Sequence, residues 1–175
     1  MSLRHALLGA LADRPRSGYE LLKHFEQSLA YAWPARHSQI YPELARLRAA
    51  GLIEQTESGP RGSKTYALTD RGLEEVRRWL RETEPDRRVR NDAALRLFFL
   101  WLLEPEEARA QLEREHDYWR GVLAELEALG EQPPGTTRKE KAFRLALEGG
   151  IRTVEARVAW LESAIDEWVA GSTVG

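Results

Sequence analysis

The chain has 175 residues, which is enough for one domain or two small ones. Its 28 acidic and 26 basic residues nearly cancel, and this balance excludes a generally basic protein that coats nucleic acid. The chain has no cysteine, which excludes disulfides, thiol catalysis and cysteine-ligated zinc. Its longest apolar run, residues 97–103, is far shorter than the roughly 20 residues of a membrane span, and we find no signal peptide. We therefore expect a soluble, cytoplasmic protein.

Apolar residues at helical spacing predict two helices at the N-terminus, over residues 2–12 and about 19–29. Leucines repeat every fourth position in the first helix, and Pro15 ends it. Ser17 and Gly18 then begin the second helix. Both helices present one apolar face, so we expect them to pack on a shared core.

A third helix and a hairpin follow. Ser38 is a suitable N-cap, with Pro42 placed in the first turn, and Gly51 ends the helix. Two short strands, residues 52–56 and 64–68, are joined by a turn rich in Ser, Gly and Pro. A helix followed at once by a basic-tipped hairpin predicts the recognition helix and two-stranded wing of a winged helix-turn-helix domain, whose dominant use is binding duplex DNA.

A fourth helix over residues 70–82 leads into a polar, proline-marked segment. We interpret residues 85–90 as a linker. It separates a winged helix DNA-binding domain, residues 1–84, from a helical dimerisation domain, residues 91–175. The first domain holds 13 basic and 11 acidic residues, whereas the remainder of the chain holds 13 basic and 17 acidic residues. The more positive half is thus the one expected to meet DNA.

The second domain is predicted to be a coiled-coil-like arrangement of helices, so the fold class is mainly α. Residues 91–103 form an expected helix that is apolar on nearly every side, and such a helix needs cover from more than one direction. Helices at about 105–129 and 138–170 carry heptad seams and form an antiparallel hairpin, which we expect a second copy to cover. The residues assigned to dimerisation are Leu95, Phe98, Phe99, Leu102, Phe143, Leu147, Ile151, Val154, Val158, Leu161, Ile165 and Trp168.

Several segments together resemble the PadR family of transcriptional regulators, named for control of phenolic acid decarboxylase. They are LLGALADRPRSGYELLKHFE (7–26), IYPELARLRAAGLIE (40–54), YALTDRG (66–72), NDAALRLFFLWLLEPEEARAQLE (91–113) and EARVAWLESAID (155–166). The last two are similar to the C-terminal domain of the longer members, which is related to virulence activators. The resemblance implies a homodimeric, effector-responsive repressor that binds a near-palindromic DNA operator sequence-specifically.

The third helix supplies the expected base-reading face, opposite its apolar face. Gln39 suits adenine, and Arg46 suits guanine or a phosphate. Wing cations suit phosphates, and for Tyr41 both a core position and a phosphate contact remain open. The full set of expected DNA contacts is Tyr19, Lys23, His37, Ser38, Gln39, Tyr41, Arg46, Arg61 and Lys64.

The resemblance also implies a small-molecule effector, because in some relatives an aromatic-lined cavity binds flat apolar compounds. Phe98 and Trp101 are our candidate wall for an aromatic or lipophilic ligand. The four histidines have no metal-ligand spacing, and no glycine-rich phosphate loop follows a strand, so we expect no enzyme, metal or cofactor. The alternative function is a non-enzymatic helical protein–protein interaction module that merely retains the winged helix fold.

Overall fold

The computed structural model of the chain describes residues 3–25, 37–59, 63–85, 91–131 and 135–171. The chain divides into two compact units, Met1–Arg87 and Arg88–Gly175, and each is described by itself. The predicted linker, residues 85–90, falls almost wholly outside the described residues, as does Arg61 of the predicted wing.

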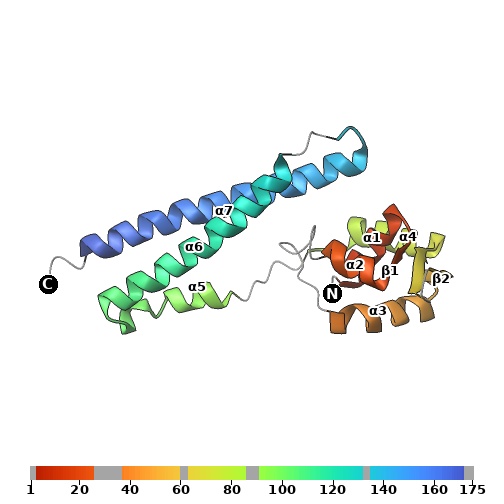
Figure 1. Cartoon of the computed structure of the whole chain (residues 1–175), viewed down its shortest axis with the longest axis horizontal. Coiled ribbons are helices and arrows are strands. Elements are labelled where there is room, and N and C mark those ends of the chain that lie inside the picture. Colours follow the sequence, from red (N-terminus) through yellow and green to blue (C-terminus); the bar gives the residue numbers. More distant parts are fainter. Residues whose placement is uncertain (1–2, 26–36, 60–62, 86–90, 132–134, 172–175) are drawn as a thin grey trace. The chain divides into compact units, whose positions relative to one another are not determined.

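The first unit holds helices around a small antiparallel sheet (Figure 1). Its elements are α1 (Leu3–Asp13), β1 (Arg16–Ser17), α2 (Gly18–His24), α3 (His37–Ala49), β2 (Ile53–Gly59), β3 (Ser63–Leu68) and α4 (Asp70–Glu82). This order is that of a winged helix domain, as the sequence predicts. The sheet, however, has three strands in the order β1-β3-β2 rather than the two strands expected.

The extra strand, β1, is held by a buried arginine. Arg16 pairs with Tyr66 of β3 and is only 7% exposed. Its Nε donates to the Ala10 carbonyl at 3.2 Å, and its Nη2 lies 2.8 Å from the Asp13 carboxylate. These bonds satisfy a carbonyl near the end of α1 that has no partner within the helix. Arg16 therefore fastens the last turn of α1 to the sheet, and a two-residue strand of this kind leaves no period in the sequence.

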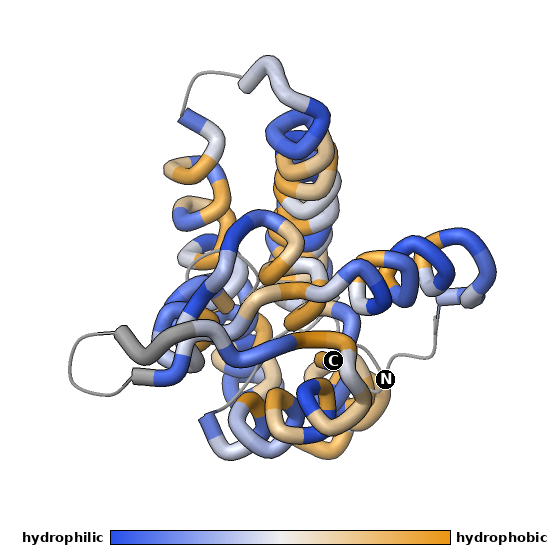
Figure 2. Tube along the Cα trace, turned by 90° about the vertical axis from the view of Figure 1, so that its right-hand side faces the viewer, coloured by the Kyte–Doolittle hydropathy of each residue, from blue (hydrophilic) through white to orange (hydrophobic). Residues whose placement is uncertain are grey.

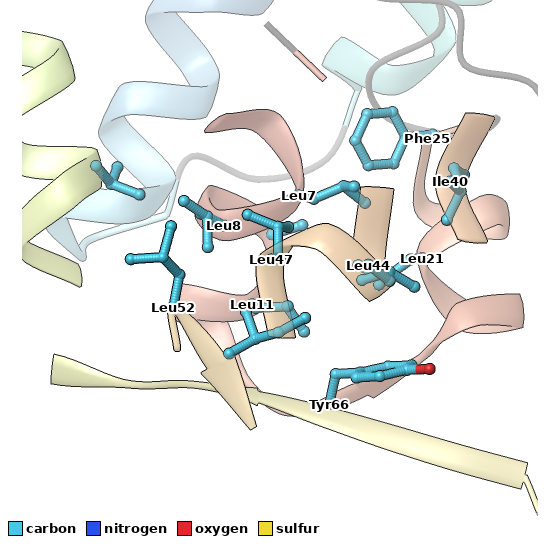
Figure 3. Packing of buried hydrophobic residues seen from close by; sticks show 13 residues of the cluster. Leu7, Leu8, Leu11, Leu21, Phe25, Ile40, Leu44, Leu47, Leu52 and Tyr66 are labelled. Carbon is cyan, nitrogen blue, oxygen red and sulfur yellow. The ribbon is translucent and has the colours of Figure 1, made fainter. Parts of the chain in front are cut away.

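The core of the first unit determines which way α3 faces. Ile40, Leu44 and Leu47 are fully buried against leucines of α1 and α2, and Figure 3 shows these side chains converging. Their spacing of four and three residues puts them on one side of the helix, as the sequence predicts. Because this side packs inward, the opposite side of α3 faces solvent.

Two details of α3 differ from expectation. The helix begins at His37, so Pro42 is its sixth residue and lies inside the helix rather than in its first turn. Without an N–H, Pro42 leaves the carbonyl of Ser38 without its usual partner in the helix. At the other end, Gly51 has φ 68°, a left-handed conformation that glycine adopts without strain, and it ends the helix as predicted.

The second unit begins with a broken helix instead of the single apolar helix expected over residues 91–103. α5 (Asp92–Leu97) is followed by a 3₁₀ turn, η3 (Leu100–Leu102). The amide of Phe98 bonds the Leu95 carbonyl at 3.2 Å, and Leu103 bonds Leu100 at 3.0 Å, so the backbone tightens to three-residue spacing. This break buries Leu100 and leaves the neighbouring aromatic side chains exposed.

Two long helices, α6 (Pro105–Gly130) and α7 (Arg138–Gly171), form the antiparallel hairpin predicted from the heptads. They lie side by side in Figure 1. Trp168 near the end of α7 donates from Nε1 to the carbonyl of Pro105 at the start of α6, at 3.2 Å. Arg144 of α7 bonds the carbonyl of Gly130 at the end of α6, at 2.9 Å. The hairpin is thus closed by hydrogen bonds at both ends.

No helix in the described part of the chain combines the length and the apolar character needed to cross a membrane. Figure 2 shows hydrophilic residues interrupting the hydrophobic ones along the helices.

Candidate nucleic-acid interface

The outer face of α3 carries the side chains that the sequence assigns to base reading. His37, Ser38 and Gln39 are exposed at its start. Arg46 is 73% exposed, and its Nη1 lies 2.9 Å from Oε2 of Glu43, whose side chain is only 14% exposed. Glu43 therefore orients the Arg46 guanidinium on the helix surface. Because exposed ion pairs contribute at most about 1 kcal/mol, the guanidinium remains available to a stronger anionic partner.

Beside this face lies a hollow of about 470 Å³ within the first unit, which we name the tyrosine pocket. It is lined by Ser17, Gly18, Tyr19, Tyr41, Ala45, Arg48, Lys64 and Tyr66. Four elements, β1, α2, α3 and β3, contribute to it. The pocket thus collects three phenol groups and two cations from segments that are distant in sequence, which is a donor set suited to phosphate oxygens.

Glycine at position 18 permits this arrangement. A Cβ added at Gly18 would lie 2.7 Å from Cε1 of Tyr41, so only glycine lets the Tyr41 ring rest on the start of α2. The same ring stands 4.6 Å from the His37 ring, centroid to centroid. Tyr41 is nevertheless partly exposed and lines the pocket. Its ring therefore packs against the start of α2 without belonging to the core, and its phosphate contact stays a prediction.

The start of α2 is held by a capping box. The Glu20 amide bonds Oγ of Ser17 at 3.2 Å, and the Ser17 amide donates to the Glu20 carboxylate at 2.7 Å. The hydrogen bond from the Ser17 backbone is the largest cause of a lowered Glu20 pKa. One turn later, Lys23 Nζ lies 5.5 Å from the centre of the Tyr19 ring. The capping box fixes the entry into α2, and Lys23 and Tyr19 are presented together.

The C-terminal part of α3 is tied to the wing. Arg48 Nη1 donates to Oε1 of Gln55 in β2 at 3.0 Å. Arg48 and Tyr66 are not among the DNA contacts expected from the sequence, yet both line the tyrosine pocket. The register that sets Tyr66 opposite Arg16 brings it there, and this pairing depends on β1. Tyr66 is buried in the core cluster, and Figure 3 shows its hydroxyl directed away from the leucines.

Comparison with known proteins identifies the chain. The family model described as "Transcriptional regulator PadR-like family" matches residues 7–78, and "Virulence activator alpha C-term" matches residues 89–168. The chain is 30% identical to "Negative transcriptional regulator PadR" of Bacillus subtilis (strain 168), over 93% of this chain and 95% of that protein. The chain belongs to the PadR family of transcriptional regulators. A PadR-family chain is a regulator and not an enzyme.

Two solved structures of a PadR relative have the same fold as this chain. Bacillus subtilis PadR in complex with operator DNA is 30% identical, with a TM-score of 0.84 and coverage of 96% of this chain and 99% of that one. The same regulator in complex with p-coumaric acid is 29% identical, with a TM-score of 0.81 and the same coverages. These matches confirm the predicted fold class.

The second unit of this PadR-family chain places part of the predicted dimer surface against its own helices. Val154, Val158 and Leu161 are buried within one chain, against α6. Leu147, Ile151, Ile165 and Trp168 pack onto the same two clusters. The partner helix of this seam is α6 of the same chain, as the predicted antiparallel hairpin requires. What remains exposed of the predicted dimer surface is Leu95, Phe98, Phe99, Leu102 and Phe143.

The predicted effector wall, Phe98 and Trp101, stays a prediction. Phe98 and Trp101 are 76% and 71% exposed, so neither encloses a cavity within the described residues of a single chain. Both follow α5 at the point where the helix breaks, and the break turns them outward. With Leu95, Phe99 and Leu102 they form an exposed surface that we name the apolar patch. Exposed apolar side chains gathered in this way are typical of a protein interaction surface.

Proposed function

We propose that this PadR-family regulator is an effector-responsive repressor that binds a near-palindromic operator sequence-specifically as a homodimer, in the cytoplasm. Its relative in Bacillus subtilis is named a negative regulator, and structures of that relative with operator DNA and with p-coumaric acid support both parts of the proposal. The observation that carries it is the outward face of α3 lying beside the tyrosine pocket.

The outward face of α3 and the tyrosine pocket contact different parts of the DNA. Gln39 and Arg46, on the exposed face of α3, read base edges in the major groove. The tyrosine pocket seats a backbone phosphate, with Arg48 and Lys64 supplying charge and the phenols supplying donors. The remaining phosphate contacts come from Lys23, His37, Ser38 and, on the wing, Arg61.

The apolar patch supplies the contact between the two copies. A two-fold axis pairs the patch with itself and covers side chains that one chain leaves exposed. It also presents two α3 helices to half-sites about 34 Å apart, as a palindromic operator requires.

The experiment is a salt-resolved binding titration. An operator is first selected from genomic fragments, and its affinity is then measured by fluorescence anisotropy across ionic strength. Arg46→Ala should weaken specific binding by roughly 1–3 kcal/mol, while Lys64→Ala should weaken all sequences alike and flatten the salt slope by about one unit. Arg77→Ala, at an exposed position of α4, is the matched control and should change neither the specific affinity nor the salt slope.

Two results would contradict the proposal. If Arg46→Ala and Lys64→Ala both bind like the wild type, the surface is assigned wrongly. If the chain dimerises but shows no salt-dependent affinity for any duplex, the alternative function, a protein–protein interaction module, is the correct one. For the dimer, Phe98→Asp should sediment as a folded monomer and lose most operator affinity, because the exposed side chain is not needed for folding.

A further inference from the structure

We propose that a second hollow, open on the surface of the C-terminal unit, is the effector site and that it selects an aromatic or lipophilic organic cation. This inference rests on the proposed effector-responsive function and specifies the chemistry of its ligand. The hollow has a volume of about 590 Å³ and lies among α5, η3, α6 and α7. We name it the indole pocket, because two tryptophans line it.

The walls of the indole pocket are apolar and well supported. Leu97, Leu100 and Leu112 line it, and the last two are buried in the core cluster of this unit. The volume falls within the range of roughly 300–1,000 Å³ typical of small-molecule sites. A ligand with a flat or branched hydrocarbon part is therefore the kind of molecule that this hollow accommodates.

The two indoles favour a positive charge on that molecule. Trp160 and Trp168 both line the pocket, and Trp168 is held in place by its hydrogen bond to the Pro105 carbonyl. The face of an indole ring is the most electron-rich among the aromatic side chains and attracts cations within about 6 Å. The same unit holds an aromatic–cation pair, where Arg157 stands 4.4 Å from the centre of the Trp119 ring.

The charged lining of the indole pocket has one sign. Among the described residues that line it, Glu167 is the only charged one. Glu167 belongs to the last two turns of α7, where the carbonyl ends of the helix dipole add negative potential, and the last turn holds no basic residue. A carboxylate ligand would be repelled here, whereas a cation would be attracted both by Glu167 and by the indoles.

Occupancy of this pocket has a direct route to the proposed dimer surface. Leu97 and Leu100 line the pocket, while Leu95 and Phe98, in the same short α5–η3 segment, belong to the apolar patch. A ligand that binds more tightly to one position of α5 therefore also favours one arrangement of the apolar patch. Operator affinity then changes by the ratio of the ligand's affinities for the two arrangements.

The test uses the full-length protein and three probes that share one cinnamyl skeleton. Isothermal titration calorimetry without DNA compares cinnamyltrimethylammonium with neutral cinnamyl alcohol and anionic cinnamate. We expect the ammonium probe to bind tightest and cinnamate weakest. Glu167→Gln should weaken binding of the ammonium probe by about threefold to tenfold and leave binding of the alcohol unchanged. Glu155→Gln, an exposed carboxylate on the same helix outside the pocket, is the matched control.

A second variant addresses the indoles. Trp160→Leu, at a half-exposed position, should weaken binding of the ammonium probe more than binding of the alcohol. Equal binding of all three probes, or unchanged ammonium affinity in both Glu167→Gln and Trp160→Leu, would overturn the inference. Operator binding is titrated in a separate experiment. If neither the wild type nor any variant binds an operator, the proposed function is refuted. The titrations without DNA still test the indole pocket in that case.

Discussion

Replacing Gly72 by alanine should destabilise the first unit, although alanine is ordinarily the better helix former. Gly72 is in the first turn of α4, and its amide bonds Oγ1 of the N-cap Thr69 at 3.1 Å. An added Cβ would lie 2.1 Å from the backbone oxygen of Leu52 and 2.7 Å from Leu68 Cδ1. Since ordinary contact begins at 3.4 Å, the start of α4 has to move away from Leu52.

The magnitude follows from three contributions. Forcing an extra methyl into a packed site costs roughly 1–3 kcal/mol. The Leu52 oxygen accepts a hydrogen bond from the Thr69 amide at 3.2 Å, and loosening this bond costs about 1 kcal/mol more. Higher helix propensity returns up to roughly 1 kcal/mol. We therefore expect Gly72→Ala to lower the free energy of unfolding of the first unit by roughly 2 kcal/mol.

Gly9 provides the matched control. It is exposed on α1, and a Cβ there would meet no described atom within 4 Å, so Gly9→Ala should stabilise by roughly 0.5–1 kcal/mol. The two chemically identical changes are compared by native-state hydrogen exchange of α1 and α3 amides during urea titration of the full chain, which reports on the first unit alone. Equal protection in Gly72→Ala and the wild type would show that α4 does not begin against Leu52.

Three further predictions concern the same unit. Arg16→Ala should lower the stability of the first unit by roughly 2 kcal/mol, because a charged donor to an α1 carbonyl is lost. Arg14→Ala, at an exposed position, should leave the stability unchanged. Equal urea midpoints for the two variants would contradict this prediction. The Ser17 backbone hydrogen bond lowers the pKa of Glu20 in the folded protein. The carboxylate therefore contributes stability above the ordinary pKa of a glutamate, and this stability is lost as the pH falls through the lowered pKa. Glu20→Gln should therefore be less stable than the wild type near neutral pH, and the difference in stability should disappear in acid. A difference that persists in acid would contradict this prediction. Gly51→Ala should lower Tm, since a φ of 68° costs an L-residue about 1 kcal/mol, and an unchanged Tm would argue against this helix end.

The sequence by itself determined the order and type of nearly all the long elements. The apolar side of α3 and the seam of α7 were predictable because helical periodicity is a local property of the chain. The cap at Thr69 and the helix end at Gly51 were predictable for the same reason, since each depends on residues within one turn. The motifs that carry the PadR resemblance lie in these segments.

Tertiary structure alone decided three other features. β1 exists because Arg16 bonds both α1 and its strand partner, and its two residues carry no period. The break that separates α5 from η3 was also undetermined, because the apolar run over residues 91–103 predicts one continuous helix. The tyrosine and indole pockets collect side chains from several elements, such as Tyr19 with Tyr66 and Leu97 with Trp168. Such contacts depend on how whole elements pack, and the spacing of residues along one element contains no record of that packing.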